Sequence, residues 1–200
     1  MTTTIDGSSG VSVVGTTGFT SQTNGLGTGL VPAEQFYRLD SNIVGANVTT
    51  AQNIIGVGVT LVGSTVYQFE AEFYVLKTAG TTSHTFNFGF GGTATLNNIA
   101  YSGLQVSLGT STWNYLDAGT SGFAFNTAAI TATGSTSTAA GIARTLKIKG
   151  TVSINAGGTF IPQYALSAAP GGAFTTQMGS YFKISPLAAS GSNVSIGTWA

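Results

Sequence analysis

The chain has 200 residues, and only 6% of them are charged, with six basic residues balancing six acidic ones. A hydrophobic share of 42% excludes an intrinsically disordered chain, and the scarcity of clustered Lys and Arg argues against a nucleic-acid partner. The absence of cysteine excludes a disulfide-stapled fold, and no apolar run approaches the ~18 residues of a membrane span.

Residues 1–31 are rich in Gly, Thr and Ser, with single apolar residues and no strong periodicity. We predict an extended N-terminal arm that becomes ordered on a partner or on the rest of the protein; a disordered tail is the alternative. The segment lacks the basic and apolar regions of a signal peptide, so we expect synthesis in a cytoplasm. The candidate partner-binding residues of the arm are Ile5, Val11, Val13, Phe19, Leu26 and Leu30.

From residue 32 onward the patterns are those of strands. Residues 35–39 and 53–62 are the first two candidates. In the next one, VYQFEAEFYVL from Val66 to Leu76, apolar residues alternate with Gln68, Glu70 and Glu72. This alternation predicts a strand with one buried face, and it places both glutamates on the opposite, solvent-facing side.

The run SHTFNFGF, residues 83–90, places His84 on the same face as its three phenylalanines. A short Gly- and Thr-containing loop joins it to the preceding strand. Two successive strands with alternating patterns and a short connection are typical of a β-hairpin. We therefore predict that these two strands pair with each other.

A second hairpin is predicted near the C-terminal end. Residues 144–155 alternate with Lys147 and Lys149 facing outward, and a Gly-containing turn leads into residues 159–167. Pro162 interrupts this last run, and proline cannot donate to a strand ladder. We therefore expect an edge strand or a bulge there.

The remaining strand candidates are residues 103–109, 121–134 and 179–187. No stretch shows helical periodicity with recognisable caps. Many short strands at this spacing predict an all-β fold. We expect an antiparallel, jelly-roll-like β-sandwich over residues 32–200, preceded by the extended arm of residues 1–31.

Glu70 and Glu72 form the closest acidic pair, which a strand would hold about 6.5–7 Å apart on one face. A glycosidase places its two carboxylates on different elements across a cleft, so that their environments differ. Two glutamates on one solvent-exposed face of a strand favour an ion-pairing role instead. The candidate partners are Lys77, or Lys147 and Lys149 across the sheet.

His84 is the only histidine of the chain. No nucleophile motif supports a catalytic triad around it, and the chain offers few further ligands for a zinc site. We expect a packed histidine near Phe86, no enzyme activity, no cofactor and no metal. Trp113 and Tyr115, in STWNYLD, are candidate glycan-binding residues, although aromatic residues of a sandwich more often belong to the core or to an interface.

The opening TTTIDGSSGVS resembles those of tailed-bacteriophage virion proteins. Residues 59–96, together with LKIKGTVSINAGGTFIPQYALS and GSYFKISPL, are similar to a β-sandwich module of phage head-decoration and fibre proteins. The resemblance covers most of residues 35–187 and rests on the Gly/Thr-rich composition and the pattern of strands. It implies a jelly-roll-like domain, usually trimeric, without enzymatic activity or catalytic residues.

Within that family we expect a capsid cement or decoration protein, because the chain is short and has no coiled-coil or repeat shaft. This implies a homotrimer, the major capsid protein as partner, a place on the capsid surface of the virion, and neither nucleic acid nor membrane as partner. The alternative is a receptor-binding, glycan-binding domain of a tail or head fibre. A secreted carbohydrate-binding module is a third possibility.

Overall fold

The computed structural model describes residues 34–108 and 136–191, residues 193 and 198, and the backbone of four short strands in the other segments. The chain divides into two compact units, Met1–Ala33 and Glu34–Ala200. Within the described part of the chain there is no helix, and so none that could cross a membrane.

The N-terminal unit contains two short strands, β1 (Thr3–Asp6) and β2 (Gly10–Val13). They pair antiparallel, with Ile5 opposite Val11 and Thr3 opposite Val13. The sequence predicts an extended arm here and does not reveal this ribbon, because the apolar residues are too few to produce a clear alternation. Phe19, Leu26 and Leu30 lie outside the described residues.

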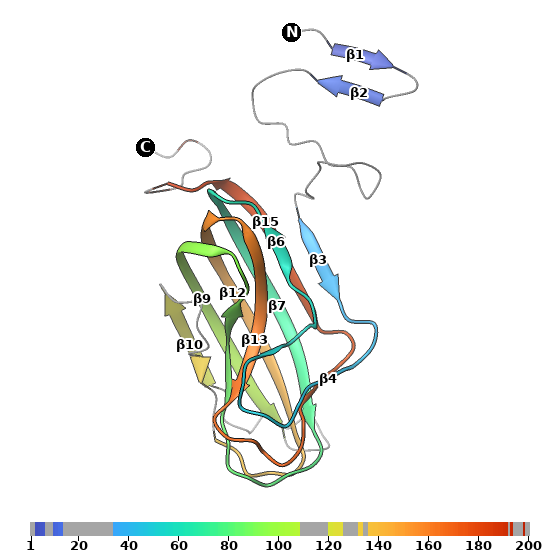
Figure 1. The fold of residues 1–200 in the computed structure, drawn as a ribbon, viewed down its shortest axis with the longest axis vertical. Helices are drawn as coiled ribbons and strands as arrows, with labels where there is room; N and C mark the ends of the chain where they lie inside the picture. Colours follow the sequence, from blue (N-terminus) through green and yellow to red (C-terminus); the bar gives the residue numbers. More distant parts are fainter. Residues whose placement is uncertain are drawn as a thin grey trace. The chain divides into compact units, whose positions relative to one another are not determined.

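The second unit is an all-β sandwich of two antiparallel sheets packed together (Figure 1), which confirms the predicted antiparallel β-sandwich; its jelly-roll-like character stays a prediction. The strands of the larger sheet are β3 (Gln35–Arg38), β4 (Ile43–Val44), β7 (Thr65–Lys77), β9 (Thr95–Leu108), β10 (Thr120–Phe125), β12 (Ile142–Ala156), β14 (Thr175–Thr176) and β15 (Tyr181–Ala189). Those of the smaller sheet are β5 (Gln52–Asn53), β6 (Val59–Leu61), β8 (Phe86–Gly91), β11 (Ala132–Thr133) and β13 (Gly158–Leu166).

The order of the larger sheet is β10-β9-β12-β7. On its other side, β7 pairs with β15 and with β14; β15 pairs in turn with β3, and β14 with β4. The order of the smaller sheet is β11-β8-β13, and β5 and β6 both pair with the other side of β13.

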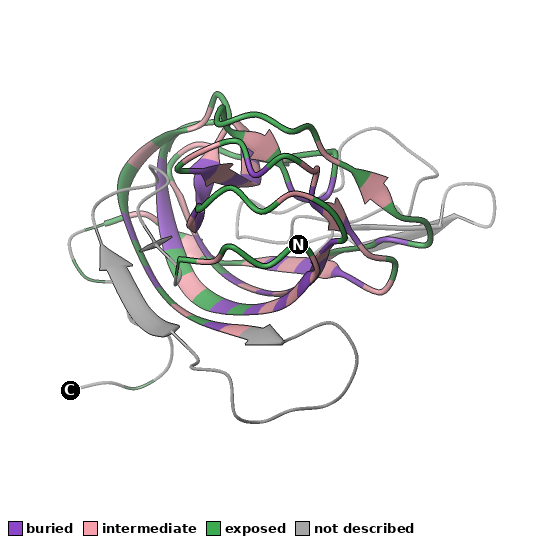
Figure 2. Ribbon diagram, turned by 90° about the horizontal axis from the view of Figure 1, so that it is seen from below, coloured by how far each residue is buried: buried purple, intermediate pink, exposed green. Residues whose placement is uncertain are grey.

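The core lies between the two sheets and is largely aromatic. Buried and exposed positions alternate along the long strands, as Figure 2 shows. The buried side chains of β7 and β8 are the ones that the alternation in the sequence predicts to face the core. They meet across the sandwich, where the ring centroids of Phe69 and Phe90 lie 5.0 Å apart and those of Phe73 and Phe88 lie 6.1 Å apart.

Both predicted hairpins are wrong. Strand β7 belongs to the larger sheet and β8 to the smaller one, and the same holds for β12 and β13. The connections between these strands cross from one sheet to the other. Consecutive strands in opposite sheets both turn an apolar face to the same core, so their alternation is the same as that of a hairpin.

Pro162 does not lie in an edge strand, because β13 pairs with β8 on one side and with β5 and β6 on the other. The backbone carbonyl of Pro162 accepts a hydrogen bond of 3.0 Å from the amide of Ile54. In a strand the amide and carbonyl of one residue point to the same side, so the missing donor of Pro162 faces the interruption between β5 and β6. The predicted single strand over residues 53–62 is this interrupted pair.

Candidate functional site

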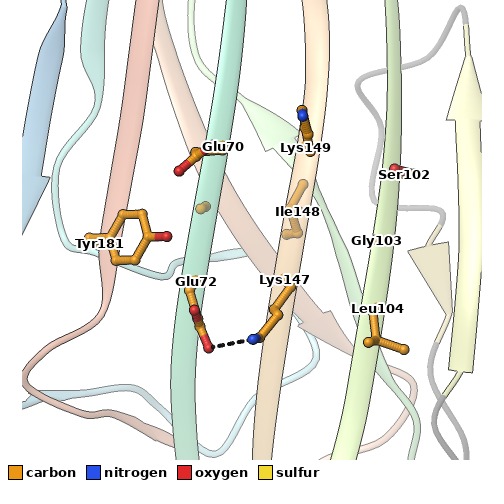
Figure 3. A pocket seen from close by; sticks show the side chains of 10 residues that line it. Glu70, Glu72, Ser102, Gly103, Leu104, Lys147, Ile148, Lys149 and Tyr181 are labelled. Carbon is orange, nitrogen blue, oxygen red and sulfur yellow. Dashed lines mark ion pairs between the residues drawn. The ribbon is translucent and has the colours of Figure 1, made fainter.

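Most of the charged side chains that the structure describes lie on the outer face of the larger sheet. Strand β7 contributes Glu70 and Glu72, and the neighbouring β12 contributes Lys149 and Lys147 directly opposite them (Figure 3). On the other side of β7, Lys183 is opposite Glu70. Acidic residues in the middle of the face are therefore flanked by basic residues of adjacent strands.

Two ion pairs lie among these charged residues, and one of them is the expected pairing of Glu72 with Lys147. Lys147 Nζ lies 3.4 Å from Glu72 Oε1, and Lys183 Nζ lies 3.2 Å from Glu34 Oε2. The proposed pairing with Lys77 is wrong, because Lys77 lies on the opposite, buried face of β7. Exposed pairs of this kind contribute little to stability, because water and salt screen them, so they determine the surface charge more than they stabilise the fold.

An open depression of about 660 Å³ lies over these strands, lined by Glu70, Glu72, Ser102, Lys147, Lys149 and Tyr181 among others. Figure 3 shows Tyr181 on β15 with its hydroxyl directed toward the two glutamates of β7. Burial, and then the negative charges of Glu70 and Glu72, raise the pKa of Tyr181. The phenol therefore stays protonated at neutral pH and can donate a hydrogen bond.

The geometry of Glu70 and Glu72 does not resemble a catalytic pair. Both carboxylates project from one strand into the same open depression, whereas acid–base pairs need two carboxyls in different environments on either side of a substrate. What the depression can do is bind: it offers charged hydrogen-bonding groups beside one aromatic ring. Sequence reasoning misses Tyr181, which long-range pairing of β15 with β7 brings opposite Glu72.

His84 is buried between the sheets, in an isolated bridge to Ser137. Its Nδ1 lies 2.8 Å from the carbonyl oxygen of Thr82, which requires that Nδ1 carry the proton and donate. Its ring meets the ring of Phe174 edge-on, with centroids 5.6 Å apart. These contacts are those of the packed histidine that the sequence predicts.

Two cations, Lys77 and Arg144, are buried near His84, and sequence reasoning misses both. Lys77 Nζ donates to the carbonyl oxygens of Gly80 (2.6 Å) and Ala139 (2.7 Å). Burial lowers the pKa of Lys77, with a further contribution from Arg144, and burial lowers the pKa of Arg144 to about 10. The alternation of inward and outward positions along the strands could have revealed them, since Lys77 and Arg144 occupy inward-facing positions of β7 and β12.

The environment of His84 predicts that acid destabilises the protein. Burial lowers the pKa of His84, and repulsion from Lys77 and Arg144 adds to this, while the carbonyl of Thr82 acts in the opposite direction. Below pH ~6.5 the unfolded chain binds a proton on this histidine that the folded chain does not, so the free energy of unfolding falls as the pH drops below ~6.5. Urea unfolding between about pH 7.5 and pH 5 measures this loss.

His84→Phe is the control for this prediction, because the chain has no second histidine. The variant should show a much flatter dependence of its urea midpoint on pH in the same range, whatever its stability at neutral pH. A native midpoint that does not change over this range, or an equal drop in the variant, would contradict the assignment to His84.

The candidate glycan residues Trp113 and Tyr115 lie outside the described residues. Among the side chains that are described, no group of three or more His, Asp or Glu could hold a metal ion. No family model matches the chain, and no curated protein or solved structure was found to be similar to it.

Proposed function

We propose that the protein is a structural component of a virion that decorates the outside of a phage head and stabilises the shell, with no reaction performed. The resemblance of most of residues 35–187 to phage head-decoration and fibre modules supports the viral part of this proposal. The distribution of charge over the sandwich supports the structural part.

The charge of the sandwich is one-sided, and this observation carries the proposal. None of the described strands β5, β6, β8 and β13 of the smaller sheet contains Asp, Glu, Lys or Arg. The larger sheet, in contrast, has charged residues on β3, β7, β12 and β15. Removing charged groups from water is the main penalty in burying a polar surface. An uncharged sheet face can pack against a neighbour without this penalty.

The proposed partners are other copies of the chain, in a homotrimer, and the major capsid protein. The protein would be made in the host cytoplasm and end on the capsid surface. An arm of residues 1–31 suits strand addition to a neighbouring sheet edge, where backbone hydrogen bonds give affinity without charged side chains. In a trimer, three weak arms would bind together with much higher avidity than one.

Deleting residues 1–31 is expected to abolish binding to phage heads while leaving the sandwich folded. The test mixes purified protein with undecorated heads of the phage that encodes it and measures the bound copies by sedimentation. The full chain should bind at a fixed stoichiometry and raise the temperature at which the heads rupture. The truncated chain should show an unchanged β-type circular dichroism spectrum and no bound copies.

Full decoration by the truncated chain would contradict the role of the arm, and failure of the full chain to bind heads would contradict the cement function. Glu72→Gln serves as a matched surface variant. It removes the ion pair with Lys147 and is expected to bind heads as the native chain does.

Receptor binding by a fibre tip is the second candidate, and the depression beside Tyr181 favours it. An aromatic ring next to charged hydrogen-bonding groups can hold a sugar, whose apolar face packs on the ring while its hydroxyls bond to the charged groups. Saturable binding to a glycan panel that is lost in Tyr181→Ala, without binding to heads, would support this function over the cement function.

A further inference from the structure

The sandwich is open along one side, where an apolar groove of about 160 Å³ lies between β3 and the segment that leads into β6. Its floor includes the buried side chains of Ile55, Phe182 and Ile184. Its rim includes Tyr37 and Val57, which are 41% and 42% exposed in the single chain. Large apolar side chains exposed beside an open core indicate a surface that a partner covers.

Both borders of the groove are sheet edges. Among the described residues, β3 pairs only with β15 and β6 pairs only with β13. The charges beside β3 pair with each other: Lys183 with Glu34, and Arg38 with Asp40. The groove therefore suits an uncharged apolar segment with strand geometry.

The chain itself contains such a segment, the ribbon of β1 and β2. Cross-strand partners share a face, so the register places the positions of Ile5, Val11 and Val13 on one face of the ribbon. Asp6, the only charged residue in residues 1–33, falls on the other face. A two-stranded ribbon is marginally stable at best in water, so its apolar face needs a surface to cover it.

We propose that the apolar face of the β1–β2 ribbon of one copy docks into the groove beside β3 of a second copy. The lining of the groove contains no charged residue, and neither do the ribbon positions that share a face with Ile5. The intervening residues 14–33 could span up to about 65 Å when extended, which is enough to reach a neighbouring body. Exchange of ribbons around a closed ring would fill every groove and leave no ribbon uncovered.

This inference rests on the self-association in the proposed function, but not on the phage head. It identifies the surface through which copies bind one another. The ribbon would be held in place by neighbours, which explains how so short a pair of strands can persist.

Disulfide trapping tests the docking, and the absence of cysteine from the native chain makes the trap specific. Full-length Val11→Cys and Val57→Cys variants, distinguished by tags of different mass, are unfolded together, refolded and oxidised. An interchain disulfide between the two tagged chains, identified by mass spectrometry, is the expected result. Val44→Cys, at an exposed valine that does not line the groove, replaces Val57→Cys in the control and should give no such product.

Each other outcome has a definite meaning. An oligomeric mass by light scattering without the Val11–Val57 disulfide would overturn groove docking and leave self-association standing. A purely intrachain disulfide in the dilute double variant V11C/V57C would show that the ribbon covers its own body, and would overturn docking to a second copy. A monomeric mass for the native chain would remove both this inference and the proposed homotrimer.

Discussion

Phe90→Ala is expected to lower the free energy of unfolding by about 3–5 kcal/mol, since large-to-small changes in a packed aromatic core have effects of this size. The Phe90 ring is buried and stacks on Phe160 of its own sheet, with centroids 4.4 Å apart. It also meets Phe69 at 5.0 Å and Tyr101 at 5.3 Å, both from the opposite sheet. Removing the ring would leave a cavity at the contact between the two sheets. Urea unfolding followed by circular dichroism measures the change.

Phe36→Ala is the matched control, because Phe36 is the same residue type on the surface. Exposed substitutions usually change stability by less than about 0.5 kcal/mol, and the stacking of Phe36 on Tyr181 adds about 0.5–1.5 kcal/mol. The two variants should therefore differ clearly in their urea midpoints. Equal midpoints for Phe90→Ala and the native chain would show that the aromatic cluster does not hold the sheets together.

Which residues face the core could be predicted from the sequence. Side-chain direction alternates with each residue of a strand, so residues 67–75 and 86–90 reveal their buried face locally. The same rule placed Glu70 and Glu72 in water. These predictions needed no knowledge of which strands are neighbours.

Strand pairing could not be predicted in the same way, because it is decided by residues far apart in the chain. The short connection after β7 suggested a hairpin, yet β8 lies in the opposite sheet and β7 pairs with β12. Burial of the aromatic faces is satisfied equally by either arrangement. The pairing of Glu72 with Lys147 was available as a candidate, whereas the position of Tyr181 in the depression was not.

The buried cations show where residue type misled the prediction. Lys77 and Arg144 occupy inward-facing positions of their strands, but charged residues are seldom fully buried, so residue type favours a solvent-exposed ion pair for Lys77. In the structure the carbonyls of Gly80 and Ala139 accept hydrogen bonds from Lys77, which offsets part of the loss of hydration. Those carbonyls come from loops whose positions depend on the whole fold.

Gly150→Ala is expected to destabilise the protein by about 1–3 kcal/mol or more, which is typical of overpacking a well-filled core. Gly150 lies in β12 between two strands, opposite Phe69 on β7 and Tyr101 on β9. A Cβ there would lie 2.4 Å from the carbonyl oxygen of Ala100, 2.5 Å from Tyr101 Cβ and 2.8 Å from Phe69 Cζ. A backbone atom in the middle of a sheet cannot move away without disturbing the ladder, so the aromatic cluster and the sheet cannot both keep their places.

Gly103→Ala is the matched variant, because Gly103 lies in the same sheet and a Cβ there would meet no atom closer than 3.7 Å. Replacing a glycine by alanine where there is room stabilises a protein by about 0.4–1 kcal/mol, since the unfolded chain loses freedom. The two substitutions should therefore change the urea midpoint in opposite directions. If Gly150→Ala stabilised the protein, Phe69 and Tyr101 would have to leave space over β12. The aromatic core would then not be tightly packed, and the Phe90 prediction, which depends on that packing, would fail as well.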